Sequence, residues 1–194
     1  MNMFGRPKVQ LFLDTETTGF HFPRDQIVEI ALVNRDGETV LNTLINPGRT
    51  IGDAKRFHGI EDAMVQNAPT LREIAPLVSA ICADAEVVIY NAEYDAKFLP
   101  GMLDDARSVR CCMQRFAPVY GDWNDFHQSY RWKKLHEAMD FIDGEWRGNP
   151  HRALADAHAC RTVWQWLEDR ERFHDHYQLA PSVNDDLLDS EVPF

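Results

Sequence analysis

Residues 13–19 read LDTETTG, and this short stretch decides what fold and what chemistry we expect of the chain. Residues 9–13 are mostly apolar and predict a buried first strand. Because the side chains of a strand alternate between its two faces, Asp14 and Glu16 point the same way. Two neighbouring carboxylates repel each other, and beside a core they also lose the solvation that water gives. The pair therefore predicts a divalent metal ion, with a solvated turn as the simpler alternative.

The composition is that of one soluble globular domain, since the chain has 194 residues, of which 44% are hydrophobic and 26% are charged. A chain of this length buries roughly 70% of its unfolded surface and does not need disulfides or metal ions to fold. The cysteines Cys82, Cys111, Cys112 and Cys160 lack the spacing of a structural zinc site, so we expect reduced thiols. The net charge of −11 argues against a broad basic face for long duplex. It allows a small site that holds a nucleic-acid end through metal ions.

The sequence predicts neither an export signal nor a membrane span. Residues 1–8 contain Arg6 and Lys8 but no apolar run. No segment of the chain approaches the roughly 18 consecutive apolar residues that a span requires. We therefore expect a cytoplasmic protein without a membrane partner.

Strands that alternate with helices predict an α/β layered domain over residues 1–176. Asp36 and Gly37 join two alternating runs and predict a hairpin. Thr70 with Glu73 predicts a capping box at the start of a helix. We expect strands at Val9–Leu13, Ile27–Asn34, Thr39–Ile45, Glu86–Tyr90 and Val109–Met113, helices from Thr70 to about Ala83 and at Tyr94–Met102, Lys133–Phe141 and Ala153–Arg172, and an irregular aromatic loop at Pro118–Tyr130. Residues 177–194 are acidic and lack Lys and Arg, which predicts a disordered tail.

Two further carboxylates and a histidine stand where a metal-dependent site needs them. Asp95 follows the strand Glu86–Tyr90 at the functional edge of an open α/β sheet, although the first turn of a helix also favours an Asp. Asp156 falls on the inward-packing stripe of the last helix, where a carboxylate needs a partner and no basic residue shares its stripe. His151 precedes this helix in a Gly-Asn-Pro loop and is suited to act as a general base near neutral pH.

The motifs LDTETTG (13–19), NAEYD (91–95) and HRALAD (151–156) resemble the three motifs of the DEDDh family of 3′–5′ exonucleases. This family includes polymerase proofreading subunits, exonuclease X and RNase T, and the resemblance spans about residues 9–170. It implies a ribonuclease H-like three-layer fold, with a mixed sheet flanked by helices. It also implies hydrolysis of the terminal phosphodiester to nucleoside 5′-monophosphates. Two Mg²⁺ or Mn²⁺ ions would be held by Asp14, Glu16, Asp95 and Asp156, with His151 as the general base.

Residues around these motifs are the expected contacts to the substrate. By the resemblance, the backbone around Thr15, Thr17 and Gly19 meets the terminal sugar. The segment HGIEDAMV, which begins at His58, is also common in these enzymes. A plain turn explains Gly19 and the His58 segment without any substrate.

Trp132, Lys133 and Lys134 belong to an aromatic and basic cluster in an otherwise acidic chain. Aromatic faces that stack unpaired bases, beside cations that meet phosphates, suit a single-stranded 3′ end. The alternative is a loop whose rings cover the core. We expect the 3′ end of DNA rather than of RNA as the substrate, although no residue reports on the 2′ hydroxyl that distinguishes the two.

Residues 185–194, DDLLDSEVPF, resemble the acidic C-terminal peptide of bacterial single-stranded DNA-binding proteins. This resemblance implies a replication or repair partner that binds Val192, Pro193 and Phe194, and the alternative is a solubilising tail. Two other functions stay open, namely a proofreading subunit of a DNA polymerase and a binding adaptor that acts through the tail. Many relatives are dimers, so the resemblance also allows a homodimer.

Overall fold

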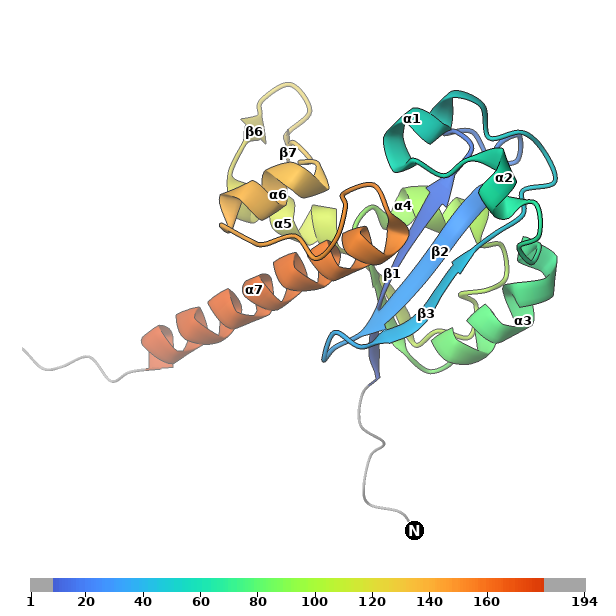
Figure 1. Cartoon of the computed structure of the whole chain (residues 1–194). Coiled ribbons are helices and arrows are strands. Elements are labelled where there is room, and N and C mark those ends of the chain that lie inside the picture. The colour runs from blue at the N-terminus through green and yellow to red at the C-terminus, as the bar shows by residue number, and fades with distance from the viewer. Residues whose placement is uncertain (1–8, 180–194) are drawn as a thin grey trace, which may run out of the picture.

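The computed structural model describes residues 9–179, with side chains described as far as Arg172. Five strands form one mixed sheet in the order β3-β2-β1-β4-β5 (Figure 1). The strands are β1 (Gln10–Thr17), β2 (Ile27–Asn34), β3 (Thr39–Leu44), β4 (Glu86–Ile89) and β5 (Ser108–Cys111). β1 pairs antiparallel with β2 and parallel with β4, so it is the central strand from which both halves of the sheet extend.

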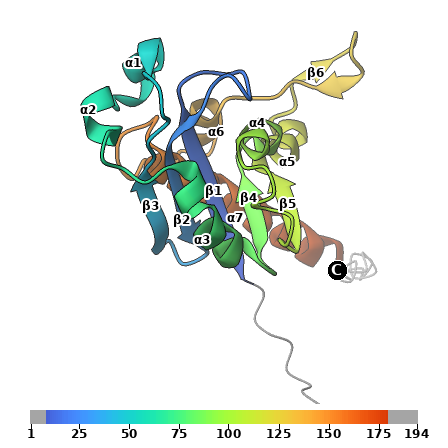
Figure 2. The same ribbon diagram turned by 90° about the vertical axis from the view of Figure 1, so that its right-hand side faces the viewer.

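Helices cover both faces of the sheet, and the two views show α3 and α7 on opposite sides of it (Figures 1 and 2). The helices are α1 (Lys55–His58), α2 (Asp62–Val65), α3 (Leu71–Cys82), α4 (Ala92–Asp95), α5 (Cys112–Tyr120), α6 (Leu135–Phe141) and α7 (Ala153–Leu179). Leu13 of β1 packs in the α3 layer with Val78, whereas Phe12 packs in the α7 layer with Val163. The alternation of β1 therefore sends its even-numbered side chains, Asp14 among them, toward α7.

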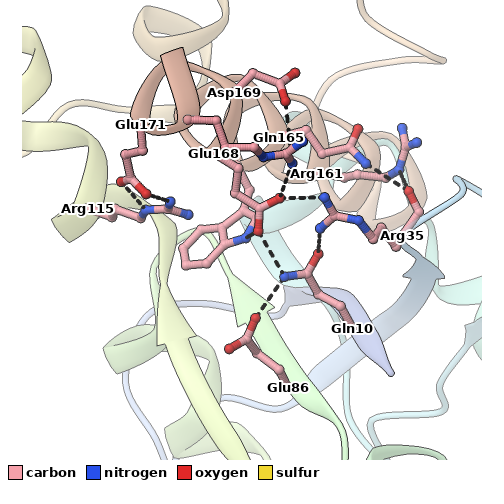
Figure 3. Close-up of polar contacts among 11 residues, drawn as sticks. Gln10, Arg35, Glu86, Arg115, Arg161, Gln165, Glu168, Asp169 and Glu171 are labelled. Carbon is pink, nitrogen blue, oxygen red and sulfur yellow. Dashed lines mark hydrogen bonds and ion pairs between the residues drawn. The ribbon is translucent and has the colours of Figure 1, made fainter. Parts of the chain in front are cut away.

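A polar network ties α7 to the end of the sheet that lies opposite the predicted site (Figure 3). Arg35 donates hydrogen bonds of 2.6 Å to Gln10 and to Glu168 of α7. Gln10 donates to Glu86 at 2.7 Å, and the indole of Trp164 donates to Glu168 at 2.9 Å. Gln10, Arg35, Glu86 and Glu168 border a polar cleft of about 390 Å³ and satisfy one another. We therefore assign the network a structural role.

The mixed sheet flanked by helices is confirmed, and the elements differ from the expectation in their bounds. β1 stays paired with β2 up to Thr17, so Asp14 and Glu16 lie inside the strand rather than beyond its end. The expected helix at Tyr94–Met102 is wrong in length. It consists of α4 and a single 3₁₀ turn that ends at Phe98, because Leu99 precedes Pro100 and is disfavoured in a helical conformation.

The region after β5 also differs from the expectation. The predicted strand at Val109–Met113 ends at Cys111, and α5 begins at the next residue. The apolar face of α5 packs in the α7 layer through Met113 and Phe116, and the helix includes Pro118. The expected aromatic loop contains a short hairpin of β6 (Trp123–Asn124) and β7 (Ser129–Tyr130).

The last helix runs further than the sequence analysis placed it. α7 continues past Arg172 to Leu179, since no Gly or Pro interrupts the chain before Pro181. The predicted tail beyond this helix, with its acidic peptide, lies outside the described residues. All four cysteines are free thiols. Within residues 9–179, no helix combines the length and the apolar character needed to cross a bilayer.

Candidate active site

The end of β1 brings acidic groups from three segments of the chain together. Asp14 and Glu16 come from β1, Asp95 from α4, and Asp156 from the first turn of α7. Carboxylate oxygens of Asp14, Glu16 and Asp156 all lie within 4.8 Å of one another. These three residues, Asp95 and His151 line a single cavity of about 180 Å³. The five residues predicted to act in catalysis are therefore neighbours in space.

Burial and mutual repulsion make these carboxyl groups hard to ionise. Burial is the main cause that raises the pKa of Glu16 to about 8, and the charges of Asp156 and Glu29 add to it. Burial also raises the pKa of Asp95 to about 7 and that of Asp156 to about 6. For Asp14, burial and then the charge of Asp95 hold the pKa well above its ordinary value. A divalent cation would relieve this crowding, and hard carboxylate oxygens fit Mg²⁺ or Mn²⁺.

Thr15 positions Asp95 from the other side of β1. Its hydroxyl donates a hydrogen bond of 2.7 Å to the Asp95 carboxylate, and both side chains are buried. This bond fixes α4 against the sheet. The backbone of Thr15 also lies against the Asp95 carboxylate, so Thr15 serves first to position Asp95.

His151 stands at the mouth of the carboxylate cavity. Its backbone N–H donates to the Asp156 carboxylate at 3.1 Å, so the loop and the start of α7 are joined. The residue has a φ of 62°, a left-handed conformation that costs about 1–2 kcal/mol for a residue other than glycine. The loop therefore holds the backbone of His151 beside Asp156, and the exposed side chain lines both this cavity and the larger one next to it.

Glu29 and Arg152 form an ion pair that the sequence analysis missed. The Arg152 guanidinium donates two hydrogen bonds to the Glu29 carboxylate, at 3.0 and 2.6 Å, and the Ala153 backbone N–H donates a third at 3.0 Å. Glu29 lies opposite Glu16 in the β1–β2 register and is 2% exposed. The pair therefore anchors the first turn of α7, which carries Asp156, to β2. The available signal was an acidic residue inside the apolar run IVEIALV (27–33).

A second, larger cavity of about 560 Å³ adjoins the carboxylate cavity and shares Thr15, Glu16, Tyr94 and His151 with it. Five of the seven predicted substrate residues line it, namely Thr15, Thr17, Gly19, His58 and Lys134. The sequence analysis did not single out Phe20, Phe57 and Tyr94, whose rings make much of its wall. Trp132 and Lys133 do not line either cavity.

Two of these lining residues have a structural reason for their identity. A Cβ on Gly19 would lie 2.6 Å from the Asp25 carboxylate, so a larger residue would displace that carboxylate from its hydrogen bond with the His21 backbone N–H. The His58 imidazole is 5% exposed and accepts a hydrogen bond of 3.0 Å from the Ile60 backbone N–H. Burial lowers the pKa of His58, which keeps the ring neutral. Its Nε2 faces the backbone of Thr17 without a well-formed hydrogen bond.

Lys133 and Lys134, although adjacent, lie in different surroundings. The Lys133 ammonium lies 2.6 Å from the Asp122 carboxylate and 4.5 Å from the centre of the Tyr120 ring, and its side chain is 14% exposed. Lys134 is exposed at the edge of the larger cavity. Of the two, Lys134 is therefore the better placed to meet a phosphate.

Comparisons with known proteins agree with this arrangement. The sequence profile of the RNase T family, described as Exonuclease, matches residues 11–163. The uncharacterized exonuclease CP81 of Escherichia phage 186 is 37% identical over 166 residues, which cover 78% of this chain and 82% of the phage protein. The DNA polymerase III subunit epsilon of Aquifex aeolicus is 28% identical over 155 residues, which cover 75% of this chain and 73% of that subunit.

Among solved structures, exonuclease X in complex with 5′ overhanging duplex DNA matches with a TM-score of 0.66 and 24% identity, over 84% of this chain and 93% of that chain. This likeness confirms the ribonuclease H-like fold. Together with the three motifs and the match to the family profile, it shows that the chain belongs to the DEDDh branch of the RNase T exonuclease family, an enzyme family of phosphodiester hydrolases.

Proposed function

We propose that the chain is a metal-dependent 3′–5′ exonuclease that removes nucleoside 5′-monophosphates from the end of a DNA strand. The observation that carries this proposal is the single cavity that Asp14, Glu16, Asp95, His151 and Asp156 line. The crowding of three carboxylates within 4.8 Å supports a divalent cation as their partner.

Each residue of the cavity has a distinct role in this proposal. When bound, two divalent ions supply an activated water and neutralise charge on the scissile phosphate. Asp14, Glu16, Asp95 and Asp156 hold the ions. His151 accepts the proton of the attacking water, because its side chain lines the carboxylate cavity and its backbone is joined to Asp156.

The larger cavity takes the terminal nucleoside in this proposal. Its phenyl rings, Phe20 and Phe57, offer apolar faces to a sugar and a base. The backbone around Thr17 and Gly19 meets the sugar, and His58 offers a neutral imidazole in the wall. The Lys134 ammonium attracts a phosphate at the entrance.

DNA is the favoured substrate because of what the related proteins bind or serve. The solved exonuclease X structure holds duplex DNA with a 5′ overhang, and the Aquifex relative is a subunit of a DNA polymerase. A single-stranded 3′ end fits the apolar and aromatic side chains that line the larger cavity, because unpaired bases can stack on them.

The test is a time course on DNA and RNA labelled at the 5′ end, in single-stranded and duplex form, with Mg²⁺. We expect shortening from the 3′ end, loss of activity in chelator and recovery with Mn²⁺. His151→Ala should keep metal binding and lose roughly 10² to 10⁴ in turnover, whereas the exposed His136→Ala serves as the matched control. Full activity in chelator would remove the metal mechanism. Normal turnover in His151→Ala would show that another base acts.

A proofreading subunit is the second candidate, favoured by the similarity to the polymerase subunit of Aquifex aeolicus. Co-purification of a DNA polymerase with the full chain would support it, and a free nuclease that sediments alone or as a homodimer would not. A binding adaptor that acts through Val192, Pro193 and Phe194 is a third. Deletion of residues 188–194 should then abolish capture of a replication or repair partner and leave hydrolysis intact.

A further inference from the structure

The aromatic hairpin, residues 122–131, carries exposed rings that the proposed catalytic roles do not use. Its two strands pair Trp123 with Tyr130 and Asn124 with Ser129. In both views it rises past the end of the sheet where β1 terminates, on the opposite side of that end from α1 and α2 (Figures 1 and 2). The hairpin and the α1–α2 segment therefore flank the approach to the active site.

The three rings of the hairpin are exposed to different degrees, and the Phe126 ring most of all. Phe126 at the turn is 88% exposed, and Trp123 and Tyr130 are 44% and 38% exposed. The Trp123 and Tyr130 rings lie 5.0 Å apart, edge to face. A two-stranded hairpin is too small to build a core of its own. Phe126 is therefore available to a ligand rather than needed for packing inside the domain, and Trp123 and Tyr130 keep part of their surface accessible.

The turn presents Phe126 on an ordered backbone. The Asn124 side-chain carbonyl accepts hydrogen bonds from the backbone N–H groups of Phe126, at 3.0 Å, and His127, at 3.2 Å. At the base of the hairpin, the Arg131 N–H donates to the Asp122 carbonyl at 2.8 Å. The Asp122 carboxylate also pairs with Lys133 at 2.6 Å. An ordered turn lowers the entropy that a bound ligand must offset.

The composition of this region fits unpaired nucleic-acid bases better than a protein surface. Residues 121–134, GDWNDFHQSYRWKK, contain four aromatic rings besides a histidine and no aliphatic side chain. They hold three basic and two acidic residues, in a chain with 31 acidic and 20 basic residues. In proteins that bind single strands, aromatic rings stack on successive unpaired bases and nearby cations contact the phosphates.

The hairpin is connected to the larger cavity by a short stretch of chain. Tyr130 ends β7, and Lys134 lines the larger cavity four residues later. Between them, the Lys133 carbonyl accepts a hydrogen bond of 2.8 Å from the Tyr90 hydroxyl, and Tyr90 lines the carboxylate cavity. Four extended residues span at most about 14 Å. A strand that keeps the stacked rise of about 3.4 Å per nucleotide covers this distance in at most about four nucleotides.

From this geometry we infer that the aromatic hairpin is a stacking platform for unpaired bases of the substrate strand, and that its base lies within about four nucleotides of the terminal nucleotide. The inference rests on the proposed function, since it assumes that the terminal nucleotide enters the larger cavity. It adds a preference for substrates whose single-stranded 3′ segment is long enough to reach the hairpin.

The test measures binding and hydrolysis separately on the full chain. Binding of dye-labelled oligothymidylates, from a dinucleotide to about ten nucleotides, is followed by anisotropy in chelator. Hydrolysis of the p-nitrophenyl ester of thymidine 5′-monophosphate with Mn²⁺ reports the active site alone. The variants are Phe126→Ala, Phe126→Leu and Phe126→Trp, with Leu77→Ala of α3 as an exposed apolar control, since Leu77 is 51% exposed.

We expect the affinity of the wild type to rise with strand length up to about six nucleotides. Phe126→Ala and Phe126→Leu should each weaken binding of the longest strand by about tenfold, while dinucleotide binding and ester hydrolysis stay unchanged. Phe126→Trp and Leu77→Ala should each keep the wild-type dependence of affinity on strand length.

Three outcomes would overturn the inference. They are a length dependence that Phe126→Ala does not alter, wild-type affinity in Phe126→Leu, and a loss of self-association in sedimentation without any loss of oligonucleotide binding. The last would assign the rings to contact between two copies of the chain. Failure of the wild type to hydrolyse the ester contradicts the proposed function instead, and the binding series in chelator still decides the role of the hairpin.

Discussion

Glu29→Gln tests whether the ion pair with Arg152 holds the active site together. Glu29 is buried in the centre of the sheet and accepts three hydrogen bonds, two from the Arg152 guanidinium and one from the backbone N–H of Ala153. Glutamine keeps the shape of the side chain, removes its charge and turns a donor toward a guanidinium that has only donors. The substitution therefore leaves Arg152 without its partner and loosens the first turn of α7.

The expected loss of stability follows from the burial of the pair. Removing one partner of a fully buried ion pair costs about 3–5 kcal/mol. The Glu29 side chain is 2% exposed and that of Arg152 is 35% exposed, so water recovers part of the loss. We expect Glu29→Gln to lower the free energy of unfolding by about 2–3 kcal/mol.

The assay is urea denaturation of the metal-free protein, followed by circular dichroism at about pH 5.5. At this pH the neighbours of Glu29 keep most of their protons, because burial raises the pKa of Glu16 to about 8 and that of Asp156 to about 6. Relief of charge repulsion therefore contributes little to the difference. Arg152→Met and the double variant complete a cycle that isolates the coupling between the two side chains.

Glu171→Gln is the matched control. Its carboxylate also accepts two hydrogen bonds from one guanidinium, that of Arg115, but the Glu171 side chain is 60% exposed. Exposed pairs contribute about 0–1 kcal/mol. The comparison requires that both variants show the same dependence of unfolding free energy on urea concentration. If Glu29→Gln then loses no more stability than Glu171→Gln, the Glu29–Arg152 pair does not anchor the first turn of α7.

Three further predictions concern charge, substrate and core. Without metal, the free energy of unfolding, measured by urea denaturation, should fall by at least about 1 kcal/mol between about pH 5 and pH 8. Burial raises the pKa of Glu16 to about 8 and that of Asp95 to about 7. In this pH range the folded state therefore binds protons that the unfolded state has lost. A saturating dose of Mg²⁺ should flatten this profile, and an equally flat profile without metal would contradict the crowding argument. Lys134→Ala should reduce the slope of log binding constant against log salt concentration, measured with an oligonucleotide, by about 0.7. Lys133→Ala should instead reduce the stability of the fold, because the Lys133 ammonium lies 2.6 Å from the Asp122 carboxylate. Phe116→Ala should lower the free energy of unfolding by about 3–5 kcal/mol, because the ring is fully buried in the α7 layer; a loss below about 1 kcal/mol would mean that the layer repacks.

The sequence predicted well the parts of the fold that local patterns determine. The hairpin between β2 and β3 follows from Asp36 and Gly37, and the capping box of α3 is present as expected, since the Glu73 backbone N–H donates to the Thr70 hydroxyl. The positions of Asp14 and Asp156 followed from strand alternation and helix periodicity, which are properties of the backbone alone.

The parts that tertiary contacts determine were missed. The partner of Glu29 is 123 residues away in the chain, so no local pattern could connect it with Arg152. α5 tolerates Pro118 because Met113 and Phe116 are buried in the α7 layer, a contact that the sequence of the helix alone does not report. The end of α4 was predictable in principle, because Pro100 disfavours a helical conformation at Leu99.

Two anchors of α7, at its first turn and at Glu168, explain how the fold tolerates four carboxyl groups in so small a volume. Repulsion among Asp14, Glu16 and Asp156 would push the start of α7 away from β1. The Glu29–Arg152 pair resists this movement at the first turn, and the network around Glu168 holds the same helix at the opposite end of the sheet. A helix held at its first turn and again at Glu168 cannot relieve the repulsion by tilting. The crowded carboxylates can then lower their energy only by keeping protons or by binding cations, which is the condition that a preformed metal site requires.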